Sequence, residues 1–158
     1  MTPEEAALVG QAIQAAEGCA RRLRRSQRTL ASRFPLTARA IEGTSPEAED
    51  DLDAFMKRFE QLVSTVQDEL FKAIALLGGE DIRSLARREV TELMERLGAL
   101  PSASRFRTLV AIRSRIAHAY PDRPERQAEN LNEAFAAIGD LLAASEHACR
   151  YLQERQRA

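Results

Sequence analysis

Two apolar stripes with steps of three and four residues place the strongest restriction on what this chain can fold into. They comprise Leu52, Phe55, Phe59, Leu62, Val66, Leu70, Ala73 and Leu77 in the middle of the chain, and Ala128, Leu131, Phe135, Ile138, Leu142, Ser145, Cys149 and Leu152 in its last third. Such spacing puts the apolar side chains on one face of an α-helix. Its persistence over many turns is typical of helical bundles and coiled seams. The stripes therefore predict two long helices, each with one buried face.

A third stripe of this kind occupies the N-terminal part of the chain, from Val9 to Phe34. The run Thr2-Pro3-Glu4-Glu5 is typical of a helix start, and we expect this helix to end before Pro35. A linker over residues 35–45 then leads to the helix that contains the first stripe. Two helices of about 30 residues with a short connection are expected to pack as an antiparallel hairpin.

Shorter helices are expected between the two long stripes. Asp81 is predicted to cap a third helix that ends at Gly98, and a fourth is predicted over residues 103 to about 119, where Pro121 interrupts it. A fifth helix is expected from Pro124 nearly to the end of the chain. The sequence has seven glycines, six prolines and 5% aromatic residues, and it shows no strand pattern. We therefore predict one all-α domain over residues 1–158, an antiparallel bundle of about five helices.

The charge is small overall but unevenly distributed. The net charge is −1, which by itself indicates no nucleic-acid partner. Residues 1–45, however, carry seven arginines against four glutamates. The cluster lies in the second half of the first predicted helix and includes Arg21, Arg24, Arg25 and Arg28. Two interpretations are open, a solvated charged helix face or a contact surface for the RNA backbone.

Several common kinds of site have no signature in the sequence. There is no glycine-rich phosphate loop, no calcium loop and no Cys or His cluster with zinc spacing, so we predict neither a metal nor a cofactor. Cys19 and Cys149 are expected to be buried free thiols. His147 is expected to be a surface histidine. The start of the chain lacks a signal-peptide core and no apolar run reaches membrane-spanning length, which favours a cytoplasmic location.

The segment from Arg113 to Tyr120 carries the residues best suited to chemistry. Arginine offers a permanent cation with a fork of donors that fits phosphate oxygens, and histidine exchanges protons near neutral pH. Arg113 falls beside the apolar stripe of its helix, where a charge needs either a partner or an open cleft. Together with His118 it forms a minimal set of groups for cleaving a phosphodiester without a metal ion.

The spacing of these two residues leaves their arrangement open. His118 lies at about 140° from Arg113 around the helix axis, so one isolated helix does not align the two side chains. The arginine could bend towards the imidazole, but the geometry favours a site that a second copy of the helix completes. In the alternative interpretation Arg113 pairs with an acidic residue in the bundle, His118 caps the helix end, and Tyr120 packs in the core.

Arg113, His118 and Tyr120 form an Arg-x4-His-x-Tyr pattern that resembles the signature of HepT-like toxins of the HEPN superfamily. The surroundings are also similar, because a helical hairpin and residues 92–101 precede the motif helix and a long helix follows it. This resemblance implies a HEPN-like fold and a toxin that acts as a metal-independent endoribonuclease. It also implies a homodimer in which the Arg–His pairs of both subunits face one cleft that binds RNA.

The resemblance further implies a role for each motif residue. Arg113 would stabilise charge on the transition state, and His118 would act as base on the ribose 2′-OH or as acid to the leaving oxygen, giving a 2′,3′-cyclic phosphate. Tyr120 would accept AMP from a nucleotidyltransferase antitoxin (MntA-like), which adds negative charge where RNA must bind. Ser114 stands where the family often has Asn, Asp or His, and Arg115 is a further candidate RNA contact. Some HEPN proteins are instead non-catalytic helical partners of nucleotidyltransferases, and this alternative stays open.

Overall fold

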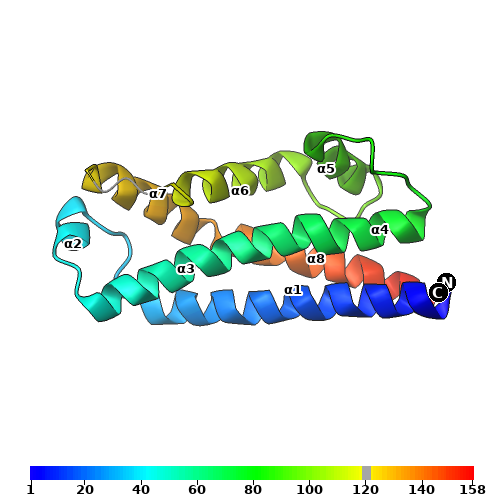
Figure 1. The fold of residues 1–158 in the computed structure, drawn as a ribbon, viewed down its shortest axis with the longest axis horizontal. Helices are drawn as coiled ribbons and strands as arrows, with labels where there is room; N and C mark the ends of the chain where they lie inside the picture. The colour runs from blue at the N-terminus through cyan, green and yellow to red at the C-terminus, as the bar shows by residue number, and fades with distance from the viewer. Residues whose placement is uncertain (119–121) are drawn as a thin grey trace.

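The computed structural model describes residues 1–118 and 122–158, and the regular structure within these residues is entirely helical (Figure 1). Helix α1 (Pro3–Leu30) runs along one edge of the molecule. At its start the Thr2 hydroxyl accepts from the Glu5 N–H at 3.1 Å, and the Glu5 carboxylate accepts from the Thr2 N–H at 2.7 Å. This reciprocal cap confirms the predicted start, whereas the helix ends four residues before the predicted position at Phe34.

A second long helix packs antiparallel to α1 and forms a hairpin with it (Figure 1). It consists of α3 (Pro46–Thr65), a π-helical turn η1 (Val66–Leu70) and α4 (Phe71–Gly78). Gly79 follows with φ of +68°, the left-handed conformation that glycine adopts without a steric penalty. The heptad-like stripe predicts this helix correctly but contains no sign of the π turn in its middle.

The predicted linker between these helices contains a short helix, α2 (Ala38–Glu42), which the sequence did not indicate. Two contacts attach this segment to α7 (Pro124–Ala136). The ring of Phe34 stacks on that of Phe135 with centroids 4.0 Å apart. The amide of Asn132 accepts from the Leu36 N–H at 2.6 Å and donates to the Leu36 carbonyl at 2.9 Å. The linker is therefore a packed part of the bundle.

Helices α5 (Arg87–Arg96) and α6 (Ala103–Ile116) are both shorter than predicted. Asp81 does not cap α5, because the helix begins only at Arg87; its carboxylate instead accepts from the Arg83 backbone N–H at 3.1 Å and from the Arg83 guanidinium at 2.9 Å. The N-cap is Ala86, whose N–H donates to the Glu89 carboxylate at 2.7 Å. At the other end, α6 stops at Ile116, three residues before the predicted limit.

The predicted fifth helix is two helices, α7 and α8 (Ile138–Arg157). Between them the Ala137 N–H bonds the Glu133 and Ala134 carbonyls, both at 3.1 Å, which tightens the last turn of α7. The apolar residues on both sides of the break face the core, so the spacing of three and four residues continues across it and did not predict it. Helix α8 then packs antiparallel to α1, and the chain ends lie side by side (Figure 1).

The buried apolar side chains form one continuous cluster between these helices. Phenylalanine rings occupy its centre, and Phe71 of α4 contacts Phe106 of α6 with ring centroids 5.2 Å apart. Helix α6 buries Phe106, Leu109, Ile112 and Ile116 in this cluster. Each such side chain stabilises the fold by about 1.5–3 kcal/mol, which fixes the rotation of α6 about its axis. Cys19 and Cys149 are buried free thiols, as predicted.

Among the described residues, no helix combines the length and apolar character required to cross a membrane.

Candidate arginine–histidine site on helix α6

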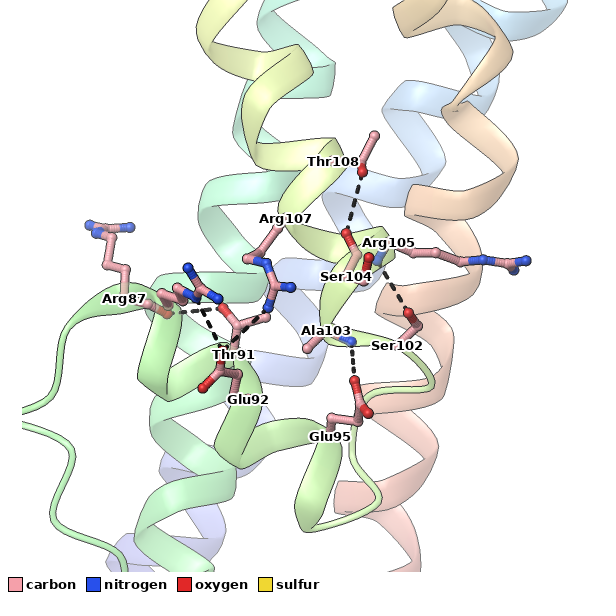
Figure 2. A network of polar contacts seen from close by, with 11 residues as sticks. Arg87, Thr91, Glu92, Glu95, Ser102, Ala103, Ser104, Arg105, Arg107 and Thr108 are labelled. Atoms are coloured by element: carbon pink, nitrogen blue, oxygen red, sulfur yellow. Dashed lines mark hydrogen bonds and ion pairs between the residues drawn. The ribbon is translucent and has the colours of Figure 1, made fainter.

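Helix α5 holds the beginning of the motif helix α6 (Figure 2). The Ser102 hydroxyl accepts from the backbone N–H three residues later at 3.2 Å, a regular helix cap. The carboxylate of Glu95, from the last turn of α5, accepts from the Ala103 N–H at the positive end of the α6 dipole. Arg107 of α6 lies 3.6 Å from the Glu92 carboxylate of α5. These contacts and the apolar face of α6 determine where Arg113 points.

Arg113 is half-buried and bonded to two neutral side chains. Its Nη1 donates to the Gln67 Oε1 at 3.0 Å and to the Ser64 Oγ at 3.3 Å. None of the ion pairs between described residues includes Arg113. The alternative in which Arg113 pairs with an acidic residue of the bundle is therefore wrong. A half-buried cation without a carboxylate partner favours an anion in its vicinity.

The π turn η1 supplies the partner of Arg113 and links it to a second arginine. The Gln67 Oε1 also accepts from Nη1 of Arg87, at 3.0 Å, and Nη2 of Arg87 lies 3.4 Å from the Asp68 carboxylate. A π turn adds a residue to the helix and changes which side chains face a neighbour, and such turns are frequent at functional sites. Gln67 and Arg87 were not recognised in the sequence, since neither belongs to a motif.

His118 is exposed immediately after the C-terminal end of α6. Its Nδ1 lies 2.6 Å from the Ser114 carbonyl oxygen. A carbonyl oxygen only accepts, so Nδ1 carries the hydrogen, and Nε2 of the neutral ring presents its lone pair. The imidazole thus satisfies a helix-end carbonyl, as the alternative interpretation predicts, while one nitrogen stays available for proton transfer. The Ser114 hydroxyl itself donates to the Val110 carbonyl at 3.2 Å.

One chain does not bring the two motif side chains into contact. Arg113 points from α6 towards η1, whereas His118 is exposed beyond the end of the helix. Arg115 bonds the Glu133 carboxylate of α7 at 2.6 Å, so it is not a free cation. The predicted modification site Tyr120 lies outside the described residues. The second histidine, His147, has its Nε2 2.9 Å from the Gly98 carbonyl, a partner that its sequence neighbourhood did not suggest.

The arginine face of α1 is defined here as Arg21, Arg24, Arg25 and Arg28. Helix α1, which carries it, runs along the opposite edge of the molecule from α6 (Figure 1). It borders two open grooves of about 400 and 340 Å³. Arg24 forms an ion pair with Glu146 of α8, whereas the other three side chains have no ion pair with the described residues. The structure therefore does not join this face to the motif residues within one chain.

The buried residue Cys149 is one of those that line the larger groove. Burial, with a smaller contribution from the negative charge of Glu17, raises the pKa of Cys149 to about 11. The thiolate is the reactive form of cysteine, so this pKa makes Cys149 a poor nucleophile near neutral pH. The groove therefore offers cations, but its cysteine is not an activated nucleophile.

Searches with this sequence and structure found no matching protein family, no matching curated protein and no matching solved structure. Within the described residues, no group of three or more His, Cys, Asp or Glu side chains is arranged to hold a metal ion. A functional assignment must therefore rest on the residues of α6 and on the side chains that surround them.

Proposed function

We propose that this protein is a metal-independent endoribonuclease of the HepT-like toxin type, with Arg113 and His118 as its catalytic residues. The observation that carries the proposal is the half-buried guanidinium of Arg113, which has only neutral partners among the described residues. An RNA phosphate supplies the missing negative charge, and the fork of guanidinium donors fits its oxygens.

In the proposed reaction, Nε2 of His118 removes the proton from a ribose 2′-OH. The 2′-oxygen then forms a bond to the adjacent phosphorus, and the bond from phosphorus to the 5′-oxygen breaks. An imidazolium returns the proton to the leaving 5′-oxygen, so the products are a 2′,3′-cyclic phosphate and a free 5′-hydroxyl. Arg113 neutralises the charge that develops on the phosphate oxygens.

We further propose that two copies of the chain share this site. Within one chain the Arg113 guanidinium bonds Gln67 of η1, whereas the exposed His118 ring bonds the Ser114 carbonyl at the end of α6, so the two side chains have different neighbours. A symmetric dimer would place the His118 of one copy opposite the Arg113 of the other. The geometry of the single chain supports this arrangement over a site built from one subunit.

For regulation, we propose the scheme that the family resemblance implies. A nucleotidyltransferase antitoxin would transfer AMP from ATP to the Tyr120 hydroxyl, forming a phosphoester and releasing pyrophosphate. Tyr120 follows His118 by two residues, so the added phosphate would compete with RNA for the same cations. Intact-mass measurement after co-expression with a nucleotidyltransferase of this antitoxin type tests this step, and an unmodified Tyr120 would contradict it.

The test of the nuclease proposal is RNA cleavage by the purified protein in EDTA. We expect wild type to yield fragments with 2′,3′-cyclic phosphate ends and to leave DNA intact. His118→Ala should reduce the rate by about 10²–10⁴-fold, the usual contribution of a general acid or base. His147→Ala is the matched control, because it removes the other imidazole, and it should retain the wild-type rate. Equal activity of wild type and His118→Ala would refute the proposal.

One observation favours a second candidate, a non-catalytic helical partner of a nucleotidyltransferase. The Ser114 hydroxyl donates its hydrogen to the Val110 carbonyl within its own helix, so the side chain after Arg113 offers a substrate phosphate no free donor. Under this function wild type would not cleave RNA but would co-purify with the nucleotidyltransferase. The cleavage assay in EDTA separates the two candidates.

A further inference from the structure

Two arginines from different helices share one neutral acceptor beside the π turn. The Gln67 Oε1 lies 3.0 Å from Nη1 of Arg113 and 3.0 Å from Nη1 of Arg87. These two nitrogens are therefore separated by no more than about 6 Å. Nη2 and Nε of Arg113 make no hydrogen bond to the described residues. The Arg87 side chain is 67% exposed, so its remaining donors face solvent.

The charges around this pair do not balance. Two guanidinium groups at such a separation repel each other unless negative charge lies close by. The only carboxylate paired with either of them in the described part of the chain is Asp68, 3.4 Å from Nη2 of Arg87 and 44% exposed. None reaches Arg113. One positive charge is thus left over where the two guanidiniums meet at the Gln67 Oε1.

We infer that Arg87 and Arg113 form a phosphate clamp, which binds one phosphate group of single-stranded RNA between the two guanidiniums. Gln67 is a positioning residue in this clamp, because its amide oxygen orients both arginines without neutralising either. A glutamate would orient them equally well but would cancel the charge that attracts the phosphate. The clamp rests on the proposed nuclease function for its substrate and adds Arg87 as a second phosphate-binding residue.

The first test replaces Gln67 by glutamate and measures binding of a 2′-O-methyl RNA oligonucleotide, which cannot be cleaved through the 2′-oxygen. Fluorescence anisotropy should show at least about tenfold weaker binding by Gln67→Glu, the loss expected when a charged hydrogen bond to the ligand is removed. Thermal unfolding should show no loss of stability, because carboxylate–guanidinium hydrogen bonds are stronger than amide ones. Gln61→Glu is the matched control, since it adds the same charge to an exposed position of α3. It should bind within about twofold of wild type.

The second test removes Arg87. Arg87→Ala should weaken binding of the same oligonucleotide by about five- to tenfold and lower the salt slope of log K by about 0.7, the value for one phosphate contact on a single strand. The control is Arg88→Ala, which removes a neighbouring exposed arginine bonded to Glu92. In cleavage assays Arg87→Ala should mainly raise KM, because the residue binds the phosphate in the ground state as well.

The outcomes separate the clamp from the nuclease activity. Loss of binding in Gln67→Glu and Arg87→Ala, with both controls unaffected, supports the clamp even if wild type cleaves no RNA. Binding by Gln67→Glu equal to that of Gln61→Glu overturns the clamp even if wild type is an active nuclease. Absence of oligonucleotide binding by wild type at low salt also overturns it.

Discussion

The arginine face of α1 and the arginine pair of Arg87 and Arg113 present cations in opposite ways. The α1 face has more guanidiniums, but most are exposed side chains around open grooves. Arg113 is half-buried, and a glutamine and a serine from another helix hold it. Immobilising a free arginine costs roughly 2 kcal/mol of rotamer entropy, and Arg113 has largely met this cost before a ligand binds. The difference lies in prior ordering more than in the number of charges, and it is the reason for proposing Arg113 as the catalytic cation.

Single arginine substitutions should give the largest difference in cleavage rate between the two regions. Arg113→Ala should lower the rate of RNA cleavage by about 10²–10³-fold, because a transition-state charge loses its preorganised donor. Arg113→Lys should recover little of this loss, since an ammonium group lacks the planar fork of donors. Arg28→Ala should leave the rate within about twofold of wild type. Initial rates on a defined RNA measure all three, and comparable losses for Arg28→Ala and Arg113→Ala would remove the distinction.

The α1 face is expected to contribute to the binding affinity for long RNA only. Helix α1 runs along the opposite edge of the molecule from α6, so a longer strand is needed to reach both helices than to reach one (Figure 1). Replacing Arg21, Arg25 and Arg28 together by glutamine should weaken binding of a long RNA by about tenfold and lower its salt slope by about 2. An oligonucleotide of about six residues should bind as it does to wild type. If long RNA also bound as it does to wild type, the arginines would be a solvated helix face.

The fold was largely predictable because the apolar spacing reports which side of a helix is buried. The hairpin and the all-helical class follow from it. The break at Ala137 was missed because Ile138 resumes the same buried face after the turn, so the periodicity continues across it. The π turn η1 was missed for the same reason, since Val66 and Leu70 at its ends are both buried.

The candidate site was predictable only in part. The motif identified Arg113 and His118, and the expectation that they diverge on a single helix agrees with their contacts. The residues around Arg113 could not be found, because its partner Gln67 and the second arginine on that glutamine, Arg87, are 46 and 26 residues away along the chain and come close only through packing. Neutral polar residues such as Ser64 also form no recognisable pattern in a sequence. Because they carry no charge, they bind Arg113 without compensating its positive charge.

The smallest effect is expected when a carboxylate beside each group of arginines is replaced by its amide. Asp68→Asn removes the carboxylate that is paired with Arg87 in the described part of the chain and would compete with a phosphate for it. The 2′-O-methyl oligonucleotide should therefore bind about two- to threefold more tightly, in the range of an exposed ion pair. Glu146→Gln makes the matching change beside Arg24 on α1 and should not alter binding of a short oligonucleotide. Both variants raise the net charge by one, so a general electrostatic effect would tighten binding equally in the two proteins. Tighter binding by Asp68→Asn alone therefore places the bound phosphate next to Arg87. Equally tighter binding by both variants would mean that affinity depends on the net charge of the protein and that the arginine pair has no special role.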